Sequence, residues 1–260
     1  MKGTVTELNA YPLKSGGGTT LRSAELTARG LPFDREFMLI TPKGRLLSQR
    51  ELAQMALLRP SYDGEVLTVD APETSPLVHK AMDDGEVLDV TVHRKECQGI
   101  DQGDEAAAWF SDLFGTDCRL VRFTGHRPTS RGGGELMFAD GYPLLVISAE
   151  SLADLNTRLD EPLPMNRFRP SIVIEGLGPY GEDDVRLLRV GGAVIEMVKS
   201  CARCVITTTD QETAERGREP LRTLAGYRNR DGGVQFGYNA VPRVLGALTV
   251  GDPIEVLEPR

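Results

Sequence analysis

Short runs of β-favouring residues recur along nearly the whole chain, and they constrain its fold more than any other feature. Glycine-rich or Asp-Gly turns separate many of them, as between neighbouring strands of a hairpin. In the first half the runs fall at 4–11, 24–28, 36–40, 66–69, 87–92 and 119–123. In the second half they fall at 144–147, 171–175, 185–190, 193–198, 205–209, 235–241 and 253–257. This pattern predicts a mainly β fold with a few helices (α+β), built from two β-barrel-like units.

A few segments interrupt the strands with helix signals. Residues 104–114 are followed by Gly115, and glycine often ends a helix. Ser148 is a good N-cap for a helix with leucines on one face. Pro220 stands in the first turn of a segment at 219–227, where proline is tolerated. We therefore expect three short helices among the strands.

The segment 125–134 is polar, rich in glycine and without periodicity, which is typical of a boundary or a mobile loop. It divides the chain into an N-terminal β-barrel unit at 1–124 and a second unit at 125–260. A chain of 260 residues is long enough for two modest domains.

Composition excludes several classes of protein. Hydrophobic content of 40% and charged content of 26% are those of a soluble globular protein. The net charge of −8 argues against a nucleic-acid binder. No apolar run is long enough for a membrane span, and the first residues read as a strand, so we expect no membrane anchor. The 4 scattered cysteines indicate a reducing compartment, and we expect the cytoplasm.

The segment that is richest in possible chemistry contains Cys201 and Cys204, with Arg203 between them. A thiolate is a soft ligand for a transition metal, and a nearby cation favours the thiolate over the thiol. A structural zinc site needs a second close pair of Cys or His, which the sequence lacks. A thioredoxin-like pair needs a helix directly after it, whereas 205–209 favours a strand. Two buried core cysteines remain an alternative.

Five arginines lie in or near the motifs, on a protein that is acidic as a whole: Arg35, Arg50, Arg167, Arg169 and Arg203. If they converge in space, they form a local anion pocket. Such a pocket suits a small phosphorylated ligand better than a polymer.

Several motifs carry a resemblance to a known family. In chain order they are Tyr11-Pro-Leu-Lys14-Ser15, Phe33-Asp-Arg35, Phe138-Ala-Asp140, Ser151-Leu-Ala-Asp-Leu-Asn156, Asn166-Arg-Phe-Arg169-Pro170, Cys201-Ala-Arg-Cys204-Val-Ile-Thr-Thr, Phe236-Gly237 and Val250-Gly-Asp-Pro253. The chain resembles the family in which an N-terminal β-barrel precedes a MOSC (molybdenum cofactor sulfurase C-terminal) domain. It is especially similar to the mitochondrial amidoxime-reducing component and its bacterial relatives.

The resemblance implies a molybdenum cofactor, in which molybdopterin holds the metal and ends in a phosphate. In the family the second cysteine of the Cys-x-x-Cys motif is the metal ligand, and that position is Cys204 here. Cys201 matches the partner position that is not a ligand. The other positions implied to contact the cofactor are Lys14, Ser15, Arg35, Asp140, Arg169, Ser171, Arg203 and Asn239. Lys14, Ser15 and Arg35 match contacts to its phosphate and pterin.

The resemblance implies two catalytic residues, Cys204 as the metal ligand and Asp140. Asp140 matches a family position near the metal, where a carboxylate can deliver a proton or orient a substrate or water. Gly141 and Tyr142 follow it where the mitochondrial proteins carry small hydroxyl residues. Asn239 stands where they carry an aromatic residue. Both differences concern the substrate pocket.

The implied activity is the reductive removal of oxygen from N-hydroxylated compounds such as amidoximes, hydroxylamines and N-hydroxylated bases. Electrons would come from a separate redox protein: a ferredoxin, a flavoprotein or a small haem protein. The competing hypothesis is a carrier of the molybdenum cofactor, or a sulfur-transfer protein, without reductase activity.

Overall fold

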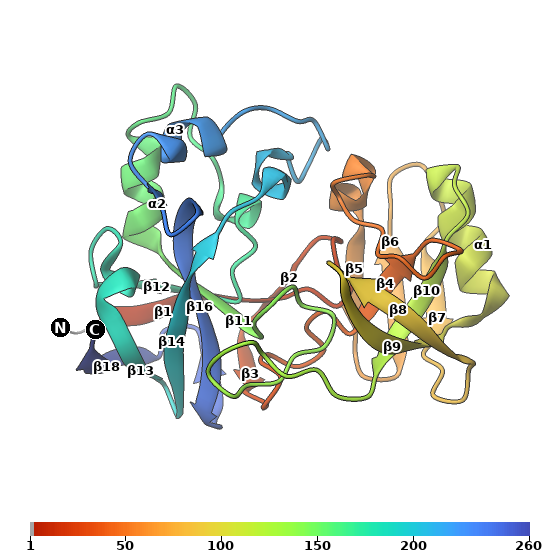
Figure 1. The fold of residues 1–260 in the computed structure, drawn as a ribbon, viewed down its shortest axis with the longest axis horizontal. Helices are drawn as coiled ribbons and strands as arrows, with labels where there is room; N and C mark the ends of the chain where they lie inside the picture. Colours follow the sequence, from red (N-terminus) through yellow and green to blue (C-terminus); the bar gives the residue numbers. More distant parts are fainter. Residues whose placement is uncertain (1–2) are drawn as a thin grey trace.

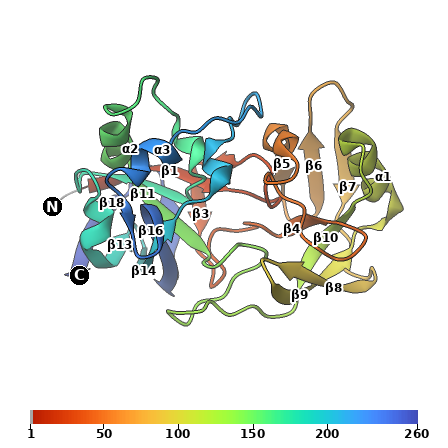
Figure 2. The same ribbon diagram turned by 45° about the horizontal axis from the view of Figure 1, so that its top comes forward.

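The computed structural model describes residues 3–260 and forms two lobes that lie side by side (Figure 1). One lobe comprises residues 37–124. The other contains the rest of the strands, and in it the first and last strands of the described chain lie side by side (Figure 2). The mainly β architecture with a few helices is therefore confirmed.

The lobe at 37–124 contains two antiparallel sheets and one helix. The first sheet has the order β4 (Phe37–Ile40), β10 (Arg119–Thr124), β9 (Lys95–Asp101) and β8 (Val87–Val92). The second joins β5 (Arg59–Tyr62), β6 (Val66–Asp70) and β7 (Leu77–Lys80). A 3-10 helix, η1 (Ala53–Leu57), precedes the second sheet. The helix α1 (Gly103–Phe114) packs against β10, and Gly115 ends it in the left-handed conformation, as expected.

The second lobe is a barrel. Within residues 3–260, nine strands form its sheet, in the order β11 (Leu144–Ser148), β12 (Ile172–Glu175), β1 (Gly3–Ala10), β18 (Pro253–Pro259), β13 (Val185–Val190), β14 (Ala193–Ala202), β16 (Gly233–Val244) and β15 (Asn229–Arg230), with β2 (Thr19–Leu21) beside β1. β11 also pairs with β16, which closes the ring. A small pair, β3 (Ser23–Glu25) and β17 (Ala247–Thr249), lies beside it.

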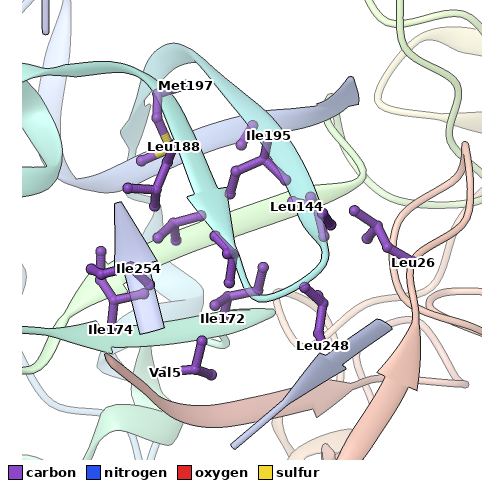
Figure 3. Close-up of a cluster of buried hydrophobic side chains, with 14 of the residues drawn as sticks. Val5, Leu26, Leu144, Ile172, Ile174, Leu188, Ile195, Met197, Leu248 and Ile254 are labelled. Atoms are coloured by element: carbon purple, nitrogen blue, oxygen red, sulfur yellow. The ribbon is translucent and has the colours of Figure 1, made fainter. Parts of the chain in front are cut away.

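The barrel interior is filled by alternate residues of its strands, as the period of a β-strand requires. Branched aliphatic side chains dominate it, among them Val5, Ile172, Ile195 and Ile254 (Figure 3). A separate apolar cluster lies under the helices α2 (Ala149–Asn156) and α3 (Leu221–Ala225). Ser148 caps α2, since its Oγ accepts a hydrogen bond from the N–H of Ser151 at 3.3 Å, as predicted.

The chain crosses between the lobes more than once. β1 pairs with β12 and β18 of the barrel, although it opens the sequence. The chain passes into the other lobe at β4 and returns after β10 through the glycine-rich segment 125–134. The segments that cross bring residues 11–16 and 33–36 to the junction of the lobes. The division of the chain into two domains at 124/125 stays a prediction.

One predicted strand is wrong. Residues 205–209 were expected to form a strand because they are β-branched, but Val205–Thr208 is a 3-10 helix (η4). The hydroxyl of Thr207 donates to the carbonyl of Cys204 at 2.9 Å. That of Thr208 donates to the carbonyl of Val205 at 2.8 Å. These local side-chain bonds satisfy the backbone of a tight turn and outweigh the β preference.

Six of the strands in residues 3–260 were missed: β2, β5, β7, β9, β15 and β17. Three of them, β5, β7 and β9, are polar along at least one face, so the sequence shows no apolar run there. They form because they pair with β6 and β8. Two further 3-10 helices, η2 (Met165–Arg167) and η3 (Gly181–Asp184), complete the described chain. None of the helices in that part of the chain combines the length and the apolar character needed to cross a membrane.

Candidate functional site

A cavity of about 160 Å³ lies at the junction of the two lobes. It is lined from the lobe at 37–124 by Leu46, Ser48, Arg50 and His93. The barrel side and the crossing segments contribute all the predicted site residues: Lys14, Ser15, Arg35, Asp140, Arg169, Ser171, Arg203, Cys204 and Asn239. The structure thus brings together positions that are up to 225 residues apart in the sequence (14 to 239). Their roles stay predictions.

One end of the cavity is a cluster of cations, which we call the anion end: the buried Lys14 and the partly buried Arg35 and Arg169. Lys14 follows β1, Arg35 precedes β4, and Arg169 follows η2. The guanidinium groups of Arg35 and Arg169 both lie against the ring of Tyr11, at 4.2 and 4.3 Å from its centroid. Burial raises the pKa of Tyr11 to about 12, so its hydroxyl stays neutral.

The three cations are compensated unequally. Arg35 bonds to the buried carboxylate of Asp34, with one contact at 2.6 Å, and Lys14 bonds to Asp140. Among the described residues no carboxylate pairs with Arg169, which donates to the carbonyl of Gly16 at 2.6 Å. Burial and the charge of Arg35 lower the pKa of Arg169 to about 10. An under-compensated, partly buried guanidinium of this kind favours an anionic ligand.

Backbone conformation at this end is unusual. Ser15, Arg35 and Arg169 have φ values of 69°, 53° and 56°, which place non-glycine residues in the left-handed region. Such conformations cost roughly 1–3 kcal/mol each and cluster at functional sites. The surrounding structure holds these side chains in place at the expense of backbone strain.

The other end, which we call the thiol end, comprises Cys204, Arg50 and His93. Cys204 follows β14 and stands at the start of η4. Its Sγ accepts a hydrogen bond from Nη2 of Arg50 at 3.4 Å. The ring nitrogens of His93 lie 3.1 and 3.3 Å from Nη1 of Arg50. A cation from the opposite lobe therefore lies against the thiol.

The neighbouring cysteine has a different cation. Arg203 donates from Nη1 to Sγ of Cys201 at 3.0 Å and from Nη2 to the carbonyl of Phe168 at 2.6 Å. Arg203 was expected to hold the thiolate of Cys204, and the structure shows it on Cys201 instead. Positions 201 and 203 are two apart at the end of a strand, where side chains at i and i+2 share a face. Arg50 takes the place beside Cys204.

Asp140 connects the two ends. Its Oδ1 contacts Nζ of Lys14 and lies 3.0 Å from Nε2 of His93. Desolvation acts against the charged form, yet the charges of Lys14 and His93 hold the pKa of Asp140 well below its ordinary value. Desolvation also lowers the pKa of Lys14, which Asp140 partly restores. The carboxylate is thus ionised near neutral pH.

Comparison with known proteins agrees with this architecture. Residues 2–117 match the family described as the MOSC N-terminal beta barrel domain. Residues 133–255 match the MOSC domain. The chain is also 34% identical to mitochondrial amidoxime reducing component 2 of Bos taurus, over 97% of this chain and 82% of that one.

The chain belongs to the MOSC-domain family with an N-terminal beta barrel.

Two further relatives carry different names. The chain is 35% identical to mitochondrial amidoxime-reducing component 1 of Mus musculus, over 98% of this chain and 82% of that one. It is 34% identical to the molybdenum cofactor sulfurase of Oryza sativa subsp. japonica, over 87% of this chain but 31% of that protein. The relatives thus include a protein named as a reductase component and a protein named as a sulfurase.

The two domains of the family contribute unlike parts of the site. The MOSC domain supplies both thiols and Asp140, while the N-terminal domain supplies Arg50 and His93 across the junction. Sequence reasoning placed Arg50 in the arginine group without a role, and it missed His93 altogether. It also included Arg167, which pairs with Asp210 at 3.0 Å and does not line the cavity.

Proposed function

We propose that this protein is a molybdenum-dependent reductase that removes oxygen from N-hydroxylated compounds and holds a molybdopterin-bound metal in the cavity. The observation that carries the proposal is the presence of two unlike ends in one cavity, a thiol at Cys204 and an under-compensated guanidinium at Arg169. A cofactor with a metal at one end and a phosphate at the other needs both. The names of the mitochondrial relatives support the activity.

The residues present fit such a group. Cys204 offers a soft thiolate, which is a suitable ligand for an oxidised transition metal. Lys14, Ser15, Arg35 and Arg169 would hold the phosphate end, where charge-assisted hydrogen bonds are strong. Ser171, Arg203 and Asn239 would line the remainder of the cofactor. When bound, the cofactor would supply the two-electron redox chemistry, as cofactors generally do.

The side chains of this protein would bind the cofactor and orient the substrate. Arg50 donates to Sγ of Cys204 and places a positive charge beside that sulfur. Asp140 is ionised, and together with His93 it presents a polar edge to a substrate. The substrate would be a small N-hydroxylated compound such as an amidoxime, a hydroxylamine or an N-hydroxylated base.

Electrons would come from a separate redox protein: a ferredoxin, a flavoprotein or a small haem protein. All four cysteines lie in the described part of the chain and are free thiols. Free thiols support a reducing compartment, for which we propose the cytoplasm.

The decisive experiment uses cofactor-loaded protein with dithionite-reduced viologen, since a small donor needs no specific docking surface. We expect benzamidoxime to be converted to benzamidine, with molybdenum and pterin each near one equivalent per chain. Fully loaded protein that reduces no compound on a panel of N-hydroxylated substrates would refute the proposal.

The second candidate function is a carrier of the molybdenum cofactor or a sulfur-transfer protein. It rests on the similarity to the rice molybdenum cofactor sulfurase, which extends over 87% of this chain. A carrier must release intact cofactor, so loaded protein would activate an added cofactor-free molybdoenzyme. A reductase would retain its cofactor under the same conditions and turn over substrate.

A further inference from the structure

The hairpin that joins β8 to β9 places a histidine where a turn normally has asparagine or glycine. Val92 pairs with Lys95, so the turn has only two residues, His93 and Arg94. Their φ values of 47° and 68° lie in the left-handed region. Two-residue turns with this backbone strongly favour Asn-Gly, because other residues are strained there. His93 is therefore held at a conformational cost, and its ring extends into the cavity.

We propose that His93 carries protons between solvent and the reacting nitrogen–oxygen group, and that Asp140 is the ionised partner that orients its ring. This inference rests on the proposed reductase function and adds a residue to it. It also assigns Asp140 a role in orientation and removes it from proton delivery.

The reaction itself creates the need for such a residue. Reduction of an amidoxime to an amidine breaks the N–O bond and releases the oxygen as water. It consumes two electrons, which the separate redox protein supplies, and two protons, which come from solvent. A side chain that reaches both solvent and the cavity can deliver those protons.

The other groups nearby are poorly suited to that task. Asp140 is held ionised by Lys14 and His93, so it has no proton to give near neutral pH. Lys14 is buried and bonded to Asp140. Arg50 stays protonated, because a guanidinium does not release its proton in this pH range.

His93 combines the required properties. Its side chain is 36% exposed, and it lines the cavity. Imidazole is the side chain that gains and loses a proton most readily near neutral pH. The charged groups that face it are Asp140 from the barrel lobe, with Lys14 behind, and Arg50 from its own lobe. Arg94 follows it in the turn and is exposed.

The test uses two variants that suit the strained turn. His93→Asn keeps a hydrogen-bonding side chain in a residue that tolerates the left-handed backbone, but it cannot carry a proton. His93→Gly removes the strain and the side chain, which leaves space for added imidazole. The control is His126→Gln, because His126 also lies beside a carboxylate, Glu135 at 3.5 Å, but outside the cavity.

In loaded protein we expect both His93 variants to retain molybdenum and pterin and to lose kcat by about 100-fold. KM for the amidoxime should change little, and imidazole should restore much of the activity of His93→Gly. The kcat of His93→Asn should no longer follow the pH dependence of the wild type. His126→Gln should behave as the wild type.

A second measurement does not depend on activity. In metal-free protein with 15N-labelled histidine, Asp140→Asn should shift the ring nitrogen resonances of His93 and leave those of His79 and His126 in place. Full kcat across the pH range in His93→Asn, or loss of cofactor from both His93 variants, would overturn this role while the reductase function stands. Loaded wild-type protein without reductase activity would overturn the proposed function and this role with it.

Discussion

The two ends of the cavity are built in opposite ways. At the anion end, Lys14 is buried and Arg35 and Arg169 are partly buried. The backbone there is strained at Ser15, Arg35 and Arg169. At the thiol end, Cys204 is reached by Arg50 and His93 across the junction, and His93 is partly exposed. One end is suited to retaining a group permanently, and the other to exchanging substrate, electrons and protons. Mutations at the two ends should therefore impair the protein in different ways, through lost activity at the thiol end and lost cofactor at the anion end.

The largest expected effect separates the two cysteines. Cys204→Ala should abolish reductase activity, because the thiol beside Arg50 faces the cavity and is the proposed metal ligand. Cys201→Ala should retain most activity, since Cys201 is bonded to Arg203. Molybdenum per chain and turnover of benzamidoxime are the measurements. If Cys201→Ala is the inactive variant, the assignment of the two thiols is reversed.

A smaller effect is expected at the anion end, where mutations should weaken cofactor binding more than they slow the reaction of the cofactor that stays bound. Hydrogen bonds to charged groups contribute about 1.5–3 kcal/mol, so Arg169→Ala should weaken cofactor binding roughly 10- to 150-fold. Lys14→Ala should have a smaller effect, because Asp140 already neutralises Lys14. Pterin content after extensive dialysis measures retention, and thermal melting of the metal-free protein measures folding.

The control for that series is Arg167→Gln. Arg167 lies two positions from Arg169 but pairs with Asp210 and does not line the cavity. Equal cofactor loss in Arg167→Gln and Arg169→Ala would show that general basicity, and not the cavity geometry, retains the cofactor.

A moderate effect is expected for Arg50→Ala in metal-free protein. Loss of its contact should slow alkylation of Cys204 by about fivefold, because partly exposed charged contacts contribute up to about 1 kcal/mol. Peptide mass spectrometry after iodoacetamide treatment resolves Cys201 and Cys204 separately. Arg203→Ala is the matched control and should change only Cys201. A slower Cys204 in Arg203→Ala would contradict the pairing of each thiol with its own cation.

The smallest effect on function is expected away from both ends, at Glu182. Its carboxyl is fully buried, and burial raises its pKa to about 7, against the hydrogen bonds from Ser151. The folded state then binds a proton more tightly than the unfolded state, so stability falls as pH rises from about 4.5 to 7. The loss is at most about 3 kcal/mol. Glu182→Gln should remove this dependence of stability on pH without changing kcat.

Glu150 provides a control of opposite sign for that prediction. Hydrogen bonds from Ser148 and from the N–H of Gly176 outweigh desolvation and lower the pKa of Glu150. Its contribution to stability is therefore present at neutral pH and is lost as pH falls through the folded pKa. Urea unfolding from about pH 3 to pH 8 distinguishes the two carboxyls, because the Glu150 contribution is lost only below its lowered pKa. An unchanged pH dependence in Glu182→Gln would refute the assignment.

Several elements could be predicted from sequence because local signals decide them. The strands β8 and β13 have the predicted bounds, Ser148 caps the start of α2, and Gly115 ends α1, as expected. These signals act over a few residues: alternation, a capping hydroxyl, a glycine with positive φ. The segment 205–209 shows the limit, since β-branched residues there form a turn that bonds to its own carbonyls.

The same distinction between local signals and tertiary contacts applies to the site. Motifs in the sequence identified nine of the residues that line the cavity, because each motif is local and the family resemblance preserves their order, but they did not reveal His93 or a role for Arg50. Only the tertiary structure decided which residues touch. Lys14 meets Asp140 across 126 positions, and Arg50 meets Cys204 across 154.

Partners at such separations depend on how the two lobes meet, and no local propensity encodes that. For this reason Arg203 could be placed beside Cys204 by sequence proximity and yet bond to Cys201. The sequence did not predict His93 as a site residue for the same reason. Its place in the site depends on a strained turn and on a carboxylate from the opposite lobe. The sequence determined the residue types and their local geometry, and the packing of the lobes decided their chemistry.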